Sequence, residues 1–263
     1  MNILVLIKEV PDMGKVKFDS EKGVVDRSSA ESEINPFDMN ALQTAVNIKN
    51  NYGANITVLT MGPLKAEKSL RDAYARGADS GILMSDRKFG GADTYATSKT
   101  LSAGIKHFGK YDLIICGEKS VDGDTGQVGA EVAEFLDIPH AYYVDKIISI
   151  NENDIDVEIE NLCGNKQIRK MKLPALIGVT KNINTPKLPT VNRKLQSLNV
   201  EIEKLSLNDL NEYINENNVG FKGSPTKVSK IVIPDSLKRE NTIYRDDYDS
   251  FIKAIKQELK KVK

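Results

Sequence analysis

Two segments rich in glycine and short polar side chains have the composition of phosphate-binding loops. Residues 85–94 and residues 117–129 each follow a short apolar run and lead directly into a helical pattern. Glycine lets the backbone approach a ligand closely, and the free N–H groups of a helix N-terminus bind phosphate. Helix capping by Asp93, Thr94 and Thr125 explains part of this composition. It does not explain the four glycines of residues 117–129, so we predict a nucleotide phosphate site there.

The usual signatures of catalysis and metal binding are missing from the sequence. The turn after the first apolar run has no GxGxxG, and the absence of GxxxxGK[ST] excludes a P-loop NTPase. His107 and His140 have no acid or nucleophile at motif spacing, and Cys116 and Cys163 lie too far apart for a zinc or CxxC motif. We therefore predict no catalytic residue and no metal site, and expect the chemistry to belong to a bound cofactor.

Strand and helix patterns alternate through the first half of the chain. Apolar runs predict strands at residues 3–7, 56–61, 81–84 and 113–116. Apolar residues at helical spacing predict helices at residues 38–51, 64–76, 93–108 and 127–136. The alternation predicts a Rossmann-like, adenine-nucleotide-binding α/β fold with a mostly parallel sheet and helices on both faces. Ligands of such sheets bind beyond the carboxyl ends of the strands, where both glycine-rich segments lie.

The second half of the chain has a different rhythm. Strand-like runs with short connections, at residues 144–150, 155–159, 166–172 and 175–179, predict antiparallel additions to the sheet. After about residue 183 the chain becomes polar and proline-punctuated, with a short helix at 207–216 and an amphipathic helix at 248–262. Segments without a core of their own are typical of arms that lie on another surface. We therefore expect a nucleotide-binding domain, residues 1–182, followed by a recognition loop and C-terminal arm, residues 183–263.

The composition indicates a soluble protein without a strong electrostatic field. Basic and acidic residues number 37 each, so the net charge does not call for nucleic acid or an anionic membrane. The N-terminal apolar run is too short for a signal peptide, and no apolar stretch approaches the length of a membrane span. We expect a cytoplasmic protein that neither binds nucleic acid nor inserts into a membrane.

Five segments resemble the beta subunits of electron-transfer flavoproteins. They are ILVLIKEVPD (3–12), INPFDMNALQTAV (34–46), MGP (61–63), IICGEKSVDGDTGQVGAEVAEFLDIPH (114–140) and KLPALIGVTKNINTPKLPT (172–190). The resemblance spans at least the first 200 residues, with the motifs in order. It implies an α/β subunit that pairs with a larger, FAD-carrying alpha subunit.

The resemblance also implies which residues hold an adenine nucleotide. By motif, these are Leu6, Asn35, Pro36, Phe37, Asp38, Met61, Asp122, Gly123, Asp124, Thr125, Gly126, Gln127, Val128, Gly129 and Val132. The amide of Asn35 suits a base or ribose edge, and Gly126, Gln127 and Gly129 suit a phosphate at a helix N-terminus.

The identity of the nucleotide depends on a second segment. SDRKFGGADTYATSKTL (85–101) resembles the electron-bifurcating members of the family, whose beta subunit holds FAD and receives hydride from NADH. Asp93, Thr94 and Thr97 would form a second cradle, which suits a diphosphate better than a monophosphate. We therefore expect FAD, with NADH as electron donor. The alternative is a carrier subunit in which AMP is structural and the only FAD sits in the alpha subunit.

The resemblance implies partners as well. Leu188 falls on the family's recognition loop, where an apolar side chain enters a pocket of the partner. That partner would be an acyl-CoA, enoyl-CoA or 2-hydroxyacid flavin dehydrogenase, and bifurcation would also deliver electrons to ferredoxin or a similar carrier. A stand-alone nucleotide-binding module of the stress-protein kind is a third alternative, which the segment after residue 183 disfavours.

Overall fold

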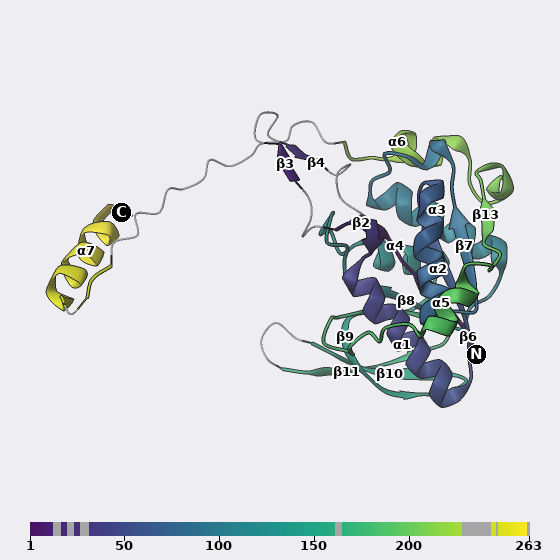
Figure 1. Cartoon of the computed structure of the whole chain (residues 1–263), viewed down its shortest axis with the longest axis horizontal. Helices are drawn as coiled ribbons and strands as arrows, with labels where there is room; N and C mark the ends of the chain where they lie inside the picture. Colours follow the sequence, from purple (N-terminus) through teal and green to yellow (C-terminus); the bar gives the residue numbers. More distant parts are fainter. Residues whose placement is uncertain are drawn as a thin grey trace. The chain divides into compact units, whose positions relative to one another are not determined.

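The computed structural model describes residues 1–12, 17–19, 24–26, 32–160, 165–227, 243–245 and 247–261. The chain divides into two compact units, Met1–Lys227 and Val228–Lys263. The first unit contains the sheet and the helices that cover it, and the second contains helix α7 (Tyr248–Lys261) (Figure 1). Cys163 lies outside the described residues.

A nine-stranded sheet forms the centre of the first unit. Its strands, in spatial order, are β11 (Gln167–Lys172), β10 (Asp154–Ile159), β9 (His140–Ile150), β12 (Ala175–Val179), β8 (Leu113–Gly117), β1 (Asn2–Leu6), β6 (Asn55–Met61), β7 (Ser80–Met84) and β13 (Glu203–Leu205). All neighbours from β9 to β13 in this order pair in parallel, whereas β10 pairs antiparallel with β9 and β11. The mostly parallel α/β fold predicted from the sequence is confirmed.

Two short antiparallel pairs lie outside the large sheet. They are β2 (Glu9–Pro11) with β5 (Ser32–Ile34), and β3 (Lys17–Asp19) with β4 (Val24–Asp26). The first pair matters for the site, because it brings the chain from the end of β1 back to the start of the first helix.

Four helices occupy the connections that the sequence predicted. They are α1 (Pro36–Tyr52), α2 (Glu67–Arg76) preceded by the 3₁₀ turn η1 (Leu64–Ala66), α3 (Thr94–Phe108) preceded by η2 (Arg87–Phe89), and α4 (Val128–Leu136). Pro36 stands in the first turn of α1, where a missing N–H costs nothing. Gly77 ends α2 with φ 133°, a conformation that L side chains rarely adopt. No helix of the described ranges is both long and apolar enough to cross a bilayer.

Strand β1 explains why helices cover both faces. Its residues Ile3 and Val5 belong to the apolar cluster that α1 and α2 cover, whereas Leu4 and Leu6 belong to the cluster that α3 and α4 cover. Successive side chains of a strand point to opposite faces, so a strand that is apolar at every position must be covered on both sides. Figure 1 shows these helices arranged around the sheet.

Strand β12 differs from its prediction as an antiparallel addition. It is fully buried and pairs in parallel with β8, opposite Leu113 to Gly117, and with β9 on its other edge. Its five residues are all apolar or glycine, which is the composition of an internal parallel strand rather than of a half-exposed one.

Residues 183–227 also differ from expectation, because they belong to the same compact unit as the sheet. The segment contains α5 (Val191–Ser197), β13, η3 (Asn208–Leu210), η4 (Glu216–Asn218) and α6 (Gly220–Gly223). Leu205, Leu210 and Val219 are buried against the cluster that α3 covers. Leu205 and Val219 stand outside the helical spacing at residues 207–216, so the sequence gives no periodicity that reveals the burial of these two. Contact of this segment with an alpha subunit remains a prediction.

The prediction of a helix at residues 207–216 is wrong. The chain there makes only the 3₁₀ turn η3 and a following turn. The Asp209 carboxylate accepts hydrogen bonds from the N–H and hydroxyl of Ser206, both at 2.7 Å. A bond of this kind belongs to a capping box, which begins a helix, yet the chain continues as a regular helix no further than η3.

The burial of this segment makes a testable prediction. Leu210→Ala should lower the free energy of unfolding of the isolated chain by about 2–5 kcal/mol, because it leaves a cavity in the core. Leu198→Ala, a control on the same segment whose side chain is 64% exposed, should change it by less than about 0.5 kcal/mol. Urea denaturation measures both. Equal, small effects would mean that the isolated chain does not order this segment.

Candidate functional site

The strand order reverses between β1 and β8. The chain proceeds from β1 to β6 and β7 on one side, and β8 then pairs with the other edge of β1. The helices that follow β1 and β8 cover opposite faces of the sheet. The loops that leave the carboxyl ends of these two strands therefore diverge. In open α/β sheets this is where ligands bind.

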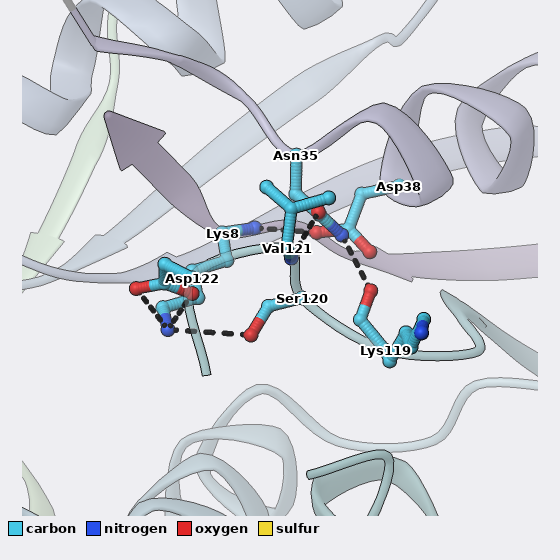
Figure 2. A network of polar contacts seen from close by, with 7 residues as sticks. All are labelled: Lys8, Asn35, Asp38, Lys119, Ser120, Val121 and Asp122. Carbon is cyan, nitrogen blue, oxygen red and sulfur yellow. Dashed lines mark hydrogen bonds and ion pairs between the residues drawn. The ribbon is translucent and has the colours of Figure 1, made fainter. Parts of the chain in front are cut away.

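The Asp38 carboxylate joins the two strands at the point of reversal. Its Oδ2 accepts from the N–H of Lys8, just after β1, at 2.8 Å (Figure 2). Its Oδ1 accepts from the N–H of Gly117, at the end of β8, at 3.0 Å. A Cβ on Gly117 would lie 2.6 Å from Asp38 Oδ1, so glycine is required there. Burial raises the pKa of Asp38 to about 7, although the Lys8 and Gly117 N–H groups favour the ionised form.

Asn35 fixes the loop that follows β8. Its Nδ2 donates to the Lys119 carbonyl at 2.8 Å, and its Oδ1 accepts from the Val121 N–H at 3.1 Å (Figure 2). The side chain is fully buried. The amide that we expected to face a base or ribose edge is therefore bonded to protein backbone. Its contact with a nucleotide stays a prediction.

Lys8 belongs to this site, although the sequence analysis did not select it. Its Nζ lies 2.7 Å and 2.8 Å from the two carboxylate oxygens of Asp122, and 3.5 Å from Ser120 Oγ (Figure 2). Burial raises the pKa of the Asp122 carboxyl, but the bond and charge of Lys8 outweigh it and hold that pKa below its usual value. The position of Lys8 could have identified it, because it directly follows the first predicted strand, where ligands of such sheets bind.

The loop from Asp122 to Gln127 presents its backbone to solvent. Gly123, Asp124, Thr125 and Gln127 are exposed. Asp124 and Gly126 have φ values of 54° and 63°, and Lys119 Nζ lies 2.7 Å from Asp124 Oδ1. The loop thus combines two ammonium groups, from Lys8 and Lys119, with exposed backbone and the Thr125 hydroxyl. These are groups that bind phosphate.

The N-terminus of α4 is occupied by a tyrosine. Backbone hydrogen bonds from Gly129 and Ala130 reach the Tyr142 hydroxyl, which also lies 3.6 Å from Cys116 Sγ. A Cβ on Gly129 would lie 2.1 Å from the Tyr142 oxygen, so this buried glycine is required by packing. Burial raises the pKa of the Tyr142 hydroxyl, and burial raises that of the Cys116 thiol to about 12, so both groups are neutral. A role of Gly129 toward phosphate stays a prediction.

The backbone N–H and both carboxylate oxygens of Asp93 form hydrogen bonds at the N-terminus of α3. Its Oδ1 accepts from the Ala96 N–H at 2.9 Å, and its Oδ2 accepts from the N–H and hydroxyl of Thr226 at 2.9 Å and 2.7 Å. The Asp93 N–H donates to Ser224 Oγ at 2.8 Å. Burial opposes ionisation, yet these bonds hold the pKa of Asp93 below its usual value. Asp93 therefore caps the helix and anchors residues 224–226, while Thr97 is half-buried on the same turn.

Glu131, which the sequence analysis also missed, links the N-terminal turns of α3 and α4. Its Oε1 accepts from the Thr94 hydroxyl at 3.2 Å, and its Oε2 accepts from the Ser98 hydroxyl at 2.8 Å. Ser98 Oγ also lies 2.7 Å from the Thr94 carbonyl and 3.2 Å from the Val128 carbonyl. The first turns of α3 and α4 are thus linked, although β7 and β8, the strands that precede them, are separated in the sheet by β1 and β6.

The remaining predicted residues divide into three groups. Leu6 and Val132 are buried in the core, and Met61 and Val128 pack against the same cluster from partly buried positions. Pro36 is exposed and Phe37 half-buried, with Lys119 Nζ 5.9 Å from its ring. Leu188 is 86% exposed and lies on a different segment, so the structure does not assign it to this site.

Comparison with known proteins gives consistent results. The model of the electron transfer flavoprotein domain matches residues 22–210. The electron transfer flavoprotein subunit beta of Clostridium acetobutylicum is 42% identical over 230 residues, covering 88% of this chain and 87% of that protein. The corresponding subunit of Thermoanaerobacterium thermosaccharolyticum is 40% identical over 98% of both chains. The caffeyl-CoA reductase-Etf complex subunit CarD of Acetobacterium woodii is 38% identical, covering 89% and 88%.

The raised pKa of Asp38 predicts a pH dependence. Its folded-state pKa of about 7 exceeds the ordinary 3.8, so the folded protein holds the proton more tightly between these values. The stability that Asp38 contributes should be present at low pH and fall as pH rises through about 7, by at most about 1.4 kcal/mol per pH unit. Asp38→Asn should lose this slope, since the amide does not titrate.

Thermal unfolding of wild type and Asp38→Asn at about pH 5 and pH 8 measures this effect. Titrations common to both proteins cancel in the difference. Because the introduced amide would point its NH₂ group at a backbone donor, the variant should be less stable than wild type, and by more at pH 5. A difference that does not change with pH would contradict the assignment.

Proposed function

The chain belongs to the electron transfer flavoprotein family, and on this premise we propose that it is a beta subunit that binds FAD at the carboxyl edge of its sheet. With a larger alpha subunit it would take electrons from NADH. It would pass them to a partner flavin dehydrogenase and to ferredoxin or a similar carrier, by flavin-based electron bifurcation.

The observation that carries the proposal is the loop after β8, at the point where the strand order reverses, together with the first turn of α3, which Glu131 joins to α4. The loop from Asp122 to Gln127 offers exposed backbone and two lysine side chains, and the turn at Thr94 and Thr97 lies beside it. The free N–H groups of a helix N-terminus attract a second anion. A diphosphate can span two such sites, whereas a monophosphate needs only one.

The residues present fit FAD once several side chains change partners. The Lys8 and Lys119 ammonium groups are paired with Asp122 and Asp124, and they would have to turn toward a phosphate. The Thr94 hydroxyl donates to Glu131, and it would have to turn to donate to a phosphate. Bound FAD would supply the electron chemistry. The chain's own residues would bind and orient it: Lys8 and Lys119 toward negative charge, Thr97 and Thr125 as hydroxyl donors, and Leu6 and Met61 as apolar walls.

Partners are proposed from the same premise. The relative in Acetobacterium woodii is named as a subunit of a caffeyl-CoA reductase complex, which supports an enoyl-CoA reductase as the partner, with acyl-CoA and 2-hydroxyacid dehydrogenases as other classes. Leu188 would dock this partner. Helix α7 exposes Phe251, Ile252, Ile255 and Leu259, apolar residues that share one face, and this face would contact the alpha subunit.

A specific observation also favours the carrier alternative with structural AMP. The loop from Asp122 to Gln127 can bind a monophosphate by itself, and the bond from Thr94 to Glu131 keeps the second cradle engaged. In that case the only flavin would sit in the alpha subunit.

Counting cofactors separates the two functions. We expect two FAD per heterodimer after acid extraction of the purified complex, quantified by chromatography against standards. One FAD with one AMP would replace the bifurcating function by the carrier function. NADH oxidation by the complex is the second readout, and it should require the second FAD.

Removing the second cradle should weaken FAD more than AMP. Thr94→Val with Thr97→Val deletes two hydroxyls that would donate to phosphate, and we expect more than about a tenfold loss of FAD affinity. Ser98→Ala is the control, because Ser98 bonds Glu131 but is fully buried and cannot reach a ligand. Calorimetric titration of the three proteins with each nucleotide measures this. An equal loss for FAD and AMP would sink the two-cradle assignment.

A further inference from the structure

A row of apolar side chains stands exposed on residues 188–198. Leu188 is 86% exposed, Val191 78%, Leu195 61% and Leu198 64%. The first of them lies in a segment without helix or strand, between Pro186 and Pro189. An exposed leucine on irregular backbone needs a reason to hold one position, since ordering it costs conformational entropy.

Two polar side chains hold the backbone immediately before Leu188. The Lys187 N–H donates to Gln43 Oε1 of α1 at 2.9 Å. The Lys187 carbonyl accepts from Arg76 Nη1 of α2 at 3.0 Å, and Arg76 Nε is itself fixed by Asp72 at 2.7 Å. Gln43 is 7% exposed, so its acceptor is buried and directed at this one residue. Both hydrogen-bonding groups of the Lys187 peptide backbone are thus engaged by the helical layer.

Apolar packing does not replace these bonds. A hollow of about 370 Å³ lies beside the hydrogen bonds that hold Lys187. Its lining residues include Met39, Asp72, Arg76 and Pro186. The segment therefore spans a partly open space rather than resting on a filled core. Hydrogen bonds hold it there. Asn184 is bonded to Asn40 of α1, and Gln43 and Arg76 hold Lys187, the residue next to Leu188.

The far end of the row is held in the same manner. Arg193 Nη2 donates to the carbonyls of Tyr74 and Ala78 at 2.9 Å and 3.2 Å, and its guanidinium lies 4.9 Å from the Tyr74 ring. Arg71 Nη1 donates to the carbonyls of residues 197, 198 and 200 at 2.8–3.0 Å. Helices α1 and α2 thus hold the row at both ends.

We propose that Gln43 and Arg76 are positioning residues that pre-order the Leu188 segment for docking to the partner flavin dehydrogenase. This inference rests on the proposed function of Leu188. A segment ordered before binding does not have to be ordered during it, so the bonds should lower the Michaelis constant for the partner without changing the rate at saturation. Both residues lie far in the sequence from Leu188. In the described part of the chain each has one side-chain hydrogen bond within its own helix, to Asn47 or Asp72, and otherwise bonds the Leu188 segment.

The first test measures the order of the segment without any partner. Trypsin can cut the Lys187–Leu188 bond only when the segment opens locally, so the cleavage rate reports that opening. Gln43→Met removes the acceptor at nearly constant size and should speed this cleavage by about tenfold. Gln43→Glu keeps the acceptor and should restore the slow rate. Arg76→Met is an independent second variant in case the first does not fold.

The second test measures docking with the complete heterodimer. A purified flavin-dependent enoyl-CoA reductase serves as the probe partner, and Leu188→Ala is the reference. We expect Gln43→Met to raise KM for the reductase about fivefold or more, with kcat and nucleotide content unchanged, and Gln43→Glu to rescue it.

The outcomes separate the inference from the function on which it rests. Unchanged trypsin cleavage in both Gln43→Met and Arg76→Met would overturn the positioning role. If Leu188→Ala raises KM but Gln43→Met does not, the positioning role fails and docking by Leu188 stands. If Leu188→Ala leaves KM unchanged, docking by Leu188 fails, and the inference that these bonds serve docking fails with it.

Discussion

The buried carboxylate of Asp38 is the interaction on which the site geometry depends. It stands in the first turn of α1 and accepts one backbone N–H from the end of β1 and one from the end of β8. These are the two strands between which the sheet reverses its order. Burying a carboxylate is costly unless its oxygens are hydrogen-bonded, and both oxygens have a backbone partner here. The two residues at which the loops leave β1 and β8 are therefore held at a fixed distance from each other.

Two residues beside this carboxylate, Asn35 and Lys8, fix the loop that follows β8. Asn35, which directly precedes α1, bonds the backbone of residues 119 and 121, and Lys8 bonds the carboxylate of Asp122. Further along, Tyr142 occupies the N-terminus of α4, and Glu131 joins α4 to α3. Side chains of the protein satisfy helix termini that a ligand could also use. The groups left facing solvent, which include Gly123, Thr125 and Gln127, are the ones available to a phosphate.

The opposite side of α1 and α2 serves a different surface. Gln43, Arg71 and Arg76 are bonded to the segment that carries the exposed apolar row, while Asp38 at the start of α1 holds the strand ends. Helix α1 therefore supports both the ends of β1 and β8 and the exposed row. The regular rise of a helix fixes the distance between Asp38 and Gln43. A shift of α1 would therefore move the strand ends and the Leu188 segment together.

The sequence by itself determined the alternation of strands and helices, the mostly parallel sheet and the location of two loops at its carboxyl edge. These follow from local signals: uninterrupted apolar runs, helical spacing, and the glycines of residues 117–129. Only the tertiary structure decided which polar groups are already used. The amide of Asn35, the carboxylate of Asp93 and the N–H of Gly129 look available in the sequence, yet each has a protein partner far along the chain. Likewise Leu205 and Val219 are buried although no periodicity marks them, because their burial comes from contacts distant in sequence. A pattern reports neighbours a few residues apart, and hydrogen-bond satisfaction between distant segments exists only after folding.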